Sequence, residues 1–263
     1  RLIRRAVLFV LGIALRVAFL VALVIGAAVA VIYQDLPEPE TLLDGRARGS
    51  VTLLDRHGDV FAWRGDQFGG DVRVGDVSPW LVKAILAAED RRFYRHWGLD
   101  PRGLARAIWV NVREGRVVQG GSTITQQVAK NVFLSHERSL DRKLKEVPMA
   151  LAMELKYDKD EILAVYLNRV YLGAGAYGFE AASQRYFGKS ARYVNPAEAA
   201  MLAGLLRAPS RFAPTSDIAR SRARATIVLA AMRETGALSE AEYDRARANP
   251  ARLSDAAAAR AGG

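Results

Sequence analysis

The feature that most constrains the fold is an uncharged apolar run near the N-terminus, Val17–Tyr33 (VAFLVALVIGAAVAVIY). The apolar pattern extends back to Ala6, and Arg16 alone interrupts it. A membrane-spanning helix needs roughly 20 such residues, and an arginine at the edge of the span can reach the interface. A buried core helix would normally show a polar face, and a cleavable signal peptide would show a small-residue cleavage site. We therefore predict a membrane anchor, with a cytoplasmic N-terminus because three cations precede it: Arg1, Arg4 and Arg5.

The rest of the chain divides by composition. Residues 1–33 form the basic end and the anchor, and residues 34–49, with two prolines and several charges, are expected to be a linker. Residues 50–75 combine β-branched and aromatic positions around a turn at 56–59, which predicts a short hairpin. Residues 76–250 carry helical patterns almost throughout, and residues 251–263 are expected to be a tail. The predicted fold class is mainly α.

Helix start and stop signals recur through this region. Ser78 and Asp100 each precede a proline, which favours a capped helix start. Gly236 lies where a helix that follows Asp217 should end. Capping-box spacing occurs at three pairs: Asp158 with Glu161, Asn195 with Glu198, and Ser239 with Glu242.

Charge and cysteine content narrow the class of function. The net charge is +10, which indicates an anionic partner: nucleic acid, anionic lipid or a phosphorylated substrate. The chain contains no cysteine, so disulfide and thiolate chemistry are excluded. Composition alone does not choose among the anionic partners.

A first candidate cluster surrounds Glu89 in the segment EDRRFYRHWG. If the helix that starts at Pro79 continues, Glu89, Phe93 and His96 share one face. A carboxylate at the end of an apolar helix is partly desolvated, which suits a general base, although a surface glutamate among arginines has the same pattern. His96 alone is better explained by packing or hydrogen bonding than by metal ligation, because no second histidine lies at ligand spacing.

A second cluster is the run 120–131, GGSTITQQVAKN, which is polar without the acid–base pairs of a solvated helix face. Ser122 or Thr123 can cap a helix over 126–132, and free amides at its start would attract an anion. The spacing is not that of a nucleotide-binding loop. The alternative is an ordinary capped helix with exposed polar groups.

A third cluster, 138–146, holds four cations. Arg138, Arg142 and Glu146 lie at successive steps of four and would share a helix face. A solvated face with internal ion pairs explains the same pattern. Pro148 follows and is expected to kink the helix just after Glu146.

Taken in order, five blocks resemble the signatures of the peptidoglycan glycosyltransferases, glycosyltransferase family 51. They are EDRRFYRHWG, GGSTITQQVAKN, RKLKE, KDEILAVYLNRVYLGAGAYG and EAAMLAGLLRAPS, which cover most of residues 80–215. The resemblance implies a lysozyme-like α fold with an amphiphilic jaw, and an enzyme that polymerises lipid II. The chain shows no S-x-x-K and no K-T-G motif, so no transpeptidase signature accompanies these blocks. The segment 50–65 is closer to the bifunctional members than to the short monofunctional ones.

The resemblance also implies roles for single residues. Glu89 corresponds to the catalytic base and Glu146 to a second carboxylate, while Lys130 and Arg138 correspond to cations that hold the donor diphosphate. Further matches line the cleft or its basic edge: Ser122, Gln126, Gln127, Arg142 and Lys143. The remaining matches support the motifs: Asp90, Phe93, His96, Thr123, Asn131, Tyr166 and Asn168. Pro148 departs from the pattern.

The implied reaction is an inverting displacement that joins a 4-hydroxyl of lipid II to the anomeric carbon of the growing chain and releases undecaprenyl diphosphate. Glu89 would take the hydroxyl proton, and cations would stabilise the diphosphate. One alternative is a lysozyme-like lytic enzyme, which must keep a carboxylic acid protonated and has no use for a cationic clamp. Another is a non-catalytic, membrane-tethered module that binds anions.

The expected setting follows from the same features. The sequence requires no cofactor and leaves open a divalent cation, Mg²⁺ or Mn²⁺, at the diphosphate. Expected partners are lipid II, the growing glycan chain, membrane lipid and other cell-wall synthesis and division proteins, and nucleic acid is not expected. The expected location is the bacterial cytoplasmic membrane, crossed once, with the catalytic domain on the periplasmic or extracellular side.

Overall fold

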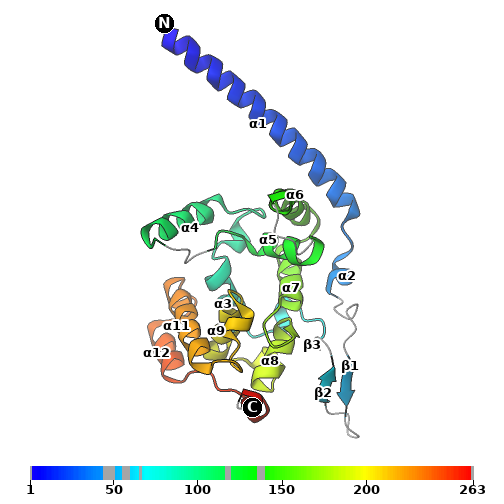
Figure 1. Ribbon diagram of the computed structural model, residues 1–263, viewed down its shortest axis with the longest axis vertical. Helices are drawn as coiled ribbons and strands as arrows, with labels where there is room; N and C mark the ends of the chain where they lie inside the picture. The colour runs from blue at the N-terminus through cyan, green and yellow to red at the C-terminus, as the bar shows by residue number, and fades with distance from the viewer. Residues whose placement is uncertain are drawn as a thin grey trace.

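The computed structural model describes residues 2–43, 51–54, 60–64, 67–115, 120–134 and 140–261. The described chain is mainly α, as predicted, with one long helix projecting from a helical body (Figure 1). The helices of the body are α3 (Pro79–Glu89), α4 (Pro101–Arg113), α5 (Ile124–Val128), α6 (Leu140–Lys156), α7 (Lys159–Arg169), α8 (Phe179–Phe187), α9 (Pro196–Leu205), α10 (Pro209–Phe212), α11 (Ile218–Glu234), α12 (Glu240–Ala248) and α13 (Asp255–Ala261). Short helical turns η2 (Val74–Asp76), η3 (Phe93–Arg95) and η5 (Ala191–Tyr193) connect them, and the π-helical turn η4 (Ala129–Phe133) extends α5.

The projecting helix is α1 (Leu2–Asp35), which contains the predicted anchor and extends it at both ends. Its segment Leu8–Asp35, 28 residues with a mean hydropathy of 2.8, is long and apolar enough to cross a membrane. Near its C-terminal end α1 contacts α6, where Val29 is buried. The C-terminal end of α1 is therefore packed against the helical body.

The described part of the predicted linker is docked on the body. It contains α2 (Pro39–Leu43), and the apolar side chains of Leu36 and Leu42 are buried. Three side chains of α6, α7 and the turn between them donate hydrogen bonds to its backbone carbonyls: Lys156 to Leu36, Tyr157 to Pro37, and Arg169 to Leu42. The proline and charge pattern indicated a linker, but Leu36 and Leu42 of this segment join the buried apolar core.

The predicted hairpin is present, together with strand pairing that the sequence did not predict. Strands β1 (Val51–Leu54) and β2 (Val60–Arg64) are antiparallel, with a register shift between Leu53 and Leu54, and the predicted turn at 56–59 lies outside the described residues. The unpredicted pair is β3 (Gln67–Phe68), which runs parallel to β4 (Ala176–Tyr177). Two-residue strands leave almost no alternation to detect in a sequence.

The capping predictions are confirmed at all three capping boxes and at Gly236, whose φ is +72°. Ser78 and Asp100 occupy N-cap positions, but their side chains do not cap. The Ser78 hydroxyl donates to the Val194 carbonyl at 2.8 Å, and the Asp100 carboxylate accepts from Arg92 at 3.1 Å. Each side chain thus binds a group outside its own helix instead of a local backbone amide: the partner of Ser78 lies 116 positions away and that of Asp100 lies 8 positions away.

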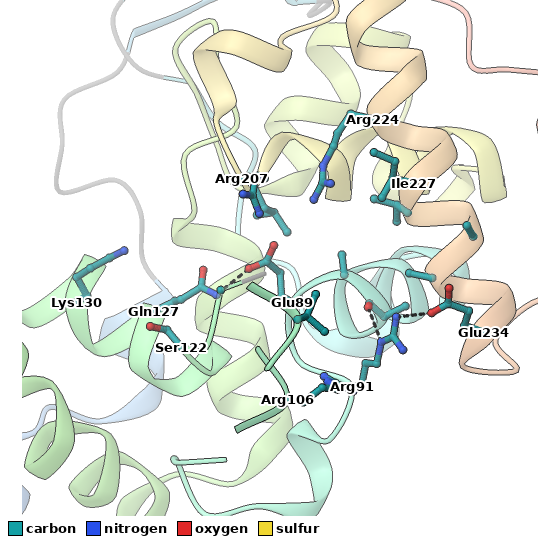
Figure 2. Close-up of a pocket in the computed structure, with 18 residues that line it drawn as sticks. Glu89, Arg91, Arg106, Ser122, Gln127, Lys130, Arg207, Arg224, Ile227 and Glu234 are labelled. Carbon is teal, nitrogen blue, oxygen red and sulfur yellow. Dashed lines mark hydrogen bonds and ion pairs between the residues drawn. The ribbon is translucent and has the colours of Figure 1, made fainter. Parts of the chain in front are cut away.

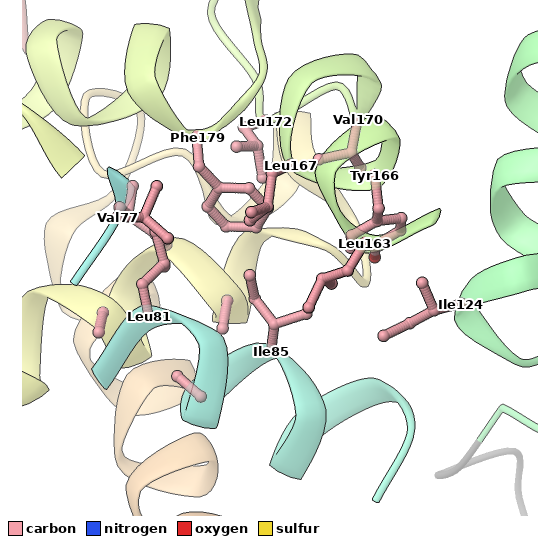
Figure 3. Close-up of a cluster of buried hydrophobic side chains, with 14 of the residues drawn as sticks. Val77, Leu81, Ile85, Ile124, Leu163, Tyr166, Leu167, Val170, Leu172 and Phe179 are labelled. Atoms are coloured by element: carbon pink, nitrogen blue, oxygen red, sulfur yellow. The ribbon is translucent and has the colours of Figure 1, made fainter. Parts of the chain in front are cut away.

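The core lies where α3, α7, α8 and α9 meet. Figure 3 shows Ile85 of α3 directed toward Leu163 and Leu167 of α7, and Leu81 of α3 beside Val77. Phe179 of α8 lies between these two groups. Every residue of α9 from Ala197 to Leu205 is buried, because its small side chains allow α3 and α11 to pack closely on it. This packing fixes the C-terminal end of α3, where Glu89 lies.

The segment predicted as a tail is instead packed in its described part. It contains α13, whose Ala257 is buried, and α13 contacts α8. The backbone amide of Ser254 donates to the Tyr186 carbonyl at 3.0 Å. An alanine-rich stretch resembles a tail by composition, but it also forms a helix readily and offers a small apolar face.

Candidate active site

A cavity of about 580 Å³ lies between the C-terminal end of α3, the α5–η4 segment, α4 and α11. Its wall contains four of the predicted site residues: Glu89, Ser122, Gln127 and Lys130. Figure 2 shows Glu89 near the centre of this group, with Gln127 and Lys130 on one side and Arg207 and Arg224 on another. The structure thus joins the first two sequence clusters into one site.

Glu89 is the last residue of α3, and the predicted single face with Phe93 and His96 is wrong. The helix ends because Asp90 has φ −154° and ψ 80°, which are not helical values. The Asp90 carboxylate lies 2.9 Å from Nε2 of His96 and accepts the Ile124 backbone amide at 3.1 Å. His96 is therefore a buried structural partner of Asp90, as its isolation in the sequence indicated.

A chain of two hydrogen bonds orients Glu89. The Tyr166 hydroxyl donates to Oε1 of Gln127 at 3.3 Å, and Nε2 of Gln127 donates to Oε2 of Glu89 at 2.9 Å. Because the amide oxygen of Gln127 already accepts from Tyr166, its nitrogen is the atom left to face the carboxylate. Burial, followed by the charges of Glu89 and Asp90, raises the pKa of Tyr166 well above its ordinary value, so the hydroxyl stays a donor.

Burial is also the main influence on Glu89 itself. It raises the pKa of the Glu89 carboxyl above its ordinary value. The hydrogen bond from Gln127 and the charges of Arg224 and Arg207 oppose this effect, while the charge of Asp90 adds to it. The result is a carboxylate with increased proton affinity inside a cationic cavity.

The polar run 120–131 divides into two sets. Ser122, Gln127 and Lys130 line the cavity. Thr123 and Gln126 form the capping box of α5, and Gln126 lies outside the cavity wall because its side-chain oxygen accepts the Thr123 amide. The predicted free amides at the start of this helix are not free, since Asp90 accepts from Ile124 and Thr123 from Gln126. Much of the run's polarity is thus satisfied within the protein.

The motif-support residues lie mostly in structural positions. Phe93 is buried and packs against Tyr94 with ring centroids 5.2 Å apart. Asn168 ties the segment before η2 to α7 through a pair of hydrogen bonds with the Val72 backbone, 3.0 and 2.7 Å long. Asn131 lies in η4 and is half-buried.

The third sequence cluster is only partly described. Arg138 lies outside the described residues, and Arg142 and Lys143 belong to α6 with side chains that are also outside them. Glu146 is 2% exposed and does not line the cavity. The helix α6 continues through Pro148 to Lys156, so the proline does not end it.

The sequence reasoning missed further charged residues of the cavity wall, one of them close to Glu89 in the chain and the others from distant segments. Arg91 forms a 2.9 Å ion pair with Glu234 across the cavity rim. Arg106, Arg207 and Arg224 add three further cations to the wall. Arg207 ends the apolar part of the fifth family-like block, where its position offered a signal, whereas Arg224 is one of several arginines on α11 and offered none.

A metal ligand set is not evident in the described part of the chain, where no three or more Asp, Glu or His side chains converge on a metal position. A divalent cation at the diphosphate stays a prediction. Such an ion would take ligands from phosphate oxygens as well as from the protein.

Comparisons with known proteins point to one family. A family model described as "Transglycosylase" matches residues 58–233. Penicillin-binding protein 1A of Aquifex aeolicus is 40% identical over 249 residues, covering 94% of this chain and 34% of that protein. The Escherichia coli protein of the same name is 43% identical over 212 residues, covering 81% of this chain and 25% of its own length.

A crystal structure of penicillin-binding protein 1A from Haemophilus influenzae has a TM-score of 0.44 and 25% identity, covering 78% of this chain and 22% of that one. The chain spans about a third or less of the length of the curated relatives it matches. The family match includes Glu89, the α5–η4 segment and all but the last residue of α11. The chain therefore belongs to the transglycosylase family, the peptidoglycan glycosyltransferases of glycosyltransferase family 51.

Proposed function

We propose that this chain polymerises lipid II into β-1,4 glycan strands by inverting displacement of undecaprenyl diphosphate, with Glu89 as general base. The observation that carries the proposal is the position of Glu89, which is held by Gln127 in a cavity whose other charged groups are mostly cations. The carboxylate suits proton removal, and the cations suit a diphosphate.

The nucleophile explains why the site needs Glu89. A sugar hydroxyl is weakly nucleophilic, so its proton must leave as the new bond forms. A carboxylate with increased proton affinity is a stronger base than an ordinary one, and burial gives Glu89 that property. Gln127 fixes the Oε2 atom at 2.9 Å, so the other oxygen of Glu89 is the one directed to a substrate hydroxyl.

The leaving group explains why the site needs cations. A diphosphate is a weak base and requires no proton, but negative charge develops on it as the glycosidic bond breaks. Lys130 supplies positive charge on the α5–η4 wall, and Arg138 is proposed to join it. An α-linked donor that gives a β-linked product requires attack from the face opposite to the leaving group. The base and the cation should therefore lie on opposite sides of the anomeric carbon.

The proposed setting is the outer face of the bacterial cytoplasmic membrane. The α1 helix is long enough to span the bilayer, and the arginines that precede it favour a cytoplasmic N-terminus. Helix α4 carries an exposed apolar stripe that would suit contact with lipid: Leu104, Ile108, Trp109 and Val112. Other cell-wall synthesis and division proteins remain proposed partners.

The raised pKa of Glu89 would also suit a lytic enzyme, because such enzymes need a protonated carboxylic acid. The cavity favours transfer, since cleavage of a neutral glycan has no use for Lys130, Arg106, Arg207 and Arg224. Incubation with lipid II and, separately, with preformed glycan distinguishes the two. Polymer from the first supports transfer, and shortening of the second supports cleavage.

The decisive test is Glu89→Gln, which keeps the shape and the hydrogen bond from Gln127 but cannot take a proton. We expect polymerisation of lipid II to fall by about 10²–10⁴-fold, the usual contribution of general base catalysis. Binding of lipid II should persist, because the cations are unchanged. Polymerisation at the wild-type rate would disprove the role of Glu89.

A further inference from the structure

We propose that Glu154 is a positioning residue for the reaction, which acts together with Lys159 as a buried clamp on α5. The clamp holds α5 at the distance from Glu89 that the hydrogen bond from Gln127 requires. Neither residue of the clamp lines the cavity, so it acts through α5 and does not touch the substrate. The inference rests on the proposed function, because it concerns the residue proposed there as the general base.

Helix α5 needs outside support because it is short. It has five residues, and an isolated helix of fewer than about 12 residues is marginal in water. Its position therefore depends on contacts with other elements, and it packs against α6 and α7. Gln127 of α5 lies 2.9 Å from Oε2 of Glu89. A displacement of α5 by about 0.7 Å is enough to break this bond, since a separation of ~3.6 Å is no longer a hydrogen bond.

The contact between Thr125 and Glu154 lies on the back of α5. Thr125 is fully buried, and its hydroxyl donates to Oε1 of Glu154 on α6 at 2.6 Å. Thr125 and Gln127 are two residues apart, which on a helix is a rotation of about 200°, so they lie on opposite faces. The bond from Thr125 therefore sets how closely α5 approaches α6, and with it the position of Gln127 on the cavity face.

Lys159 completes the clamp and extends it to the segment that follows Glu89. Its Nζ atom lies 2.7 Å from Oε1 of Glu154, whose side chain is only 4% exposed, and its charge compensates the buried carboxylate. The same ammonium lies 4.5 Å from the ring centroid of the buried Phe93 in η3, which is a favourable cation–π distance. Elements α5, α6, α7 and η3 therefore meet at one ion pair.

The backbone at Gly98 shows how closely the clamp is packed. Gly98 has a φ of +66°, and a Cβ atom there would stand 3.1 Å from Cγ of Glu154 and 3.0 Å from the Ala150 carbonyl oxygen. The Gly98 carbonyl accepts the hydroxyl of Thr123, the N-cap of α5, at 2.6 Å. The segment after η3 thus contacts both α5 and the stem of Glu154, so the start and the middle of α5 are tied to the same part of α6.

An isosteric substitution tests the clamp with little change in packing. Thr125→Val removes the hydroxyl that donates to Glu154 and leaves the ion pair with Lys159 in place. We expect kcat/KM for polymerisation to fall about 10–100-fold, because catalysis is sensitive to displacements of less than 1 Å. Thr125→Ser keeps the hydroxyl and should keep most of the activity. Wild-type activity in Thr125→Val, or an equal loss in Thr125→Ser, overturns the clamp.

The pH profile separates positioning from a general loss of stability. Burial raises the pKa of Glu89 and the hydrogen bond from Gln127 lowers it, so loss of that bond should raise the pKa further. The acid limb of kcat/KM should therefore move to higher pH in Thr125→Val. Three charged groups act on Glu89 and are unchanged by the substitution: Asp90, Arg207 and Arg224. An acid limb at the wild-type pH in Thr125→Val overturns the positioning role.

Another ion pair of the fold provides a matched control. Glu154→Met removes the carboxylate that Lys159 compensates, and Glu198→Met does the same at the Lys189–Glu198 pair, where Nζ and Oε2 are 2.8 Å apart. Glu198 lies in the first turn of α9 and does not line the cavity. Both variants should lower Tm, but only Glu154→Met should move the acid limb. An equal movement of the limb in both variants overturns the role of Glu154.

Titration of the Glu89 carboxyl without substrate keeps the inference separate from the proposed function. The full chain is labelled with carbon-isotope glutamate for NMR, and the Glu89 signal is identified by its absence in Glu89→Gln. The pKa of Glu89 should be higher in Thr125→Val than in the wild type, and Thr125→Ser should restore the wild-type value. If the wild-type chain makes no polymer, the proposed function fails, while this titration still decides whether the clamp positions Gln127. Equal pKa values of Glu89 in the wild type and Thr125→Val overturn the inference.

Discussion

At the residue scale, the burial of Glu89 has opposite effects on the activity and on the stability of the protein. Burial increases the proton affinity that a base needs, but it also disfavours the charged form in the folded protein. The same carboxylate is therefore expected to increase activity and to reduce stability. Active sites commonly combine these two effects.

Glu89→Gln should accordingly make the protein more stable as it becomes inactive. Because the folded pKa of Glu89 is raised, the folded chain holds an extra proton between the unfolded and folded pKa values, and stability falls as pH rises through that window. Glutamine does not ionise, so the variant does not lose stability in this way, and its Tm should exceed that of the wild type at pH 8. Thermal unfolding at pH 8 and pH 4 checks the prediction, and the difference should shrink at pH 4. A lower Tm for the variant at pH 8 would contradict it.

The pH dependence of activity tests the same group independently. As pH falls through the raised pKa of Glu89, the base is protonated, so the acid limb of kcat/KM should lie above 4.5, the ordinary value for glutamate. Since the Arg224 charge lowers the pKa of Glu89, Arg224→Gln should move this limb to higher pH. Initial rates of polymerisation across pH 4 to 8 measure both. An unmoved limb would show that Arg224 does not act on Glu89.

Lys130 offers a test of the donor side. Lys130→Ala removes a cation from the cavity wall and should reduce kcat/KM by about 10–100-fold, because hydrogen bonds to charged groups are worth about 1.5–3 kcal/mol. Lys83→Ala is the control, since Lys83 is exposed on α3 and lies 4.5 Å from the Trp80 ring centroid. Steady-state polymerisation measures both variants. Comparable losses in the two would indicate a general charge effect.

The site residues differ in how far the sequence could reveal them. Glu89, Gln127 and Lys130 lie in dense local blocks, so their types and spacing were informative. The sequence alone does not show whether Gln126 or Gln127 faces the cavity. The side chain of Gln126 is engaged in the capping box of α5, and that of Gln127 donates to Glu89. Arg224 lines the cavity from α11, which packs against Gly204 of α9, and no local sequence pattern encodes that tertiary contact.

At the element scale, the start of a helix was easier to predict than its end or its exposed face. The end of α3 is set by Asp90, whose carboxylate is held by His96 and the Ile124 amide, and these contacts depend on the tertiary fold. Helix α4 carries its apolar stripe on an exposed face, with Trp109 71% and Val112 74% exposed. Periodicity identifies such a stripe but does not say whether protein or lipid covers it.

We expect the membrane to cover the α4 stripe. In vesicles containing brominated acyl chains, the full protein should show quenching of tryptophan fluorescence that falls when Trp109 is replaced by Phe. Trp80→Phe is the control, because Trp80 is half-buried on α3. Equal quenching in the wild type and Trp109→Phe would place α4 away from lipid.

At the scale of the whole molecule, the anchor and the catalytic body form a connected unit. The segment between them looked like a linker in sequence because prolines and charges dominate it. Its Leu36 and Leu42 side chains are nevertheless buried, and three of its carbonyls accept hydrogen bonds from α6, α7 and the turn that joins them. These partners lie more than a hundred positions along the chain, so local composition could not reveal them. The docking orients the cavity relative to α1, and hence relative to a bilayer that α1 would span.

This connection can be loosened without touching the cavity. Tyr157→Phe removes the hydroxyl that donates to the Pro37 carbonyl, and Lys156→Met removes the amine that donates to the Leu36 carbonyl. Each lost hydrogen bond should cost about 1 kcal/mol, so the double variant should release the segment more often. A glutamyl endopeptidase should then cleave after Glu40 faster than in the wild type. Polymerisation in bilayers should fall while lipid II binding in detergent stays unchanged, because the variants alter the orientation of the cavity and leave its chemistry intact. Unchanged cleavage after Glu40 would show that the leucines alone hold the segment.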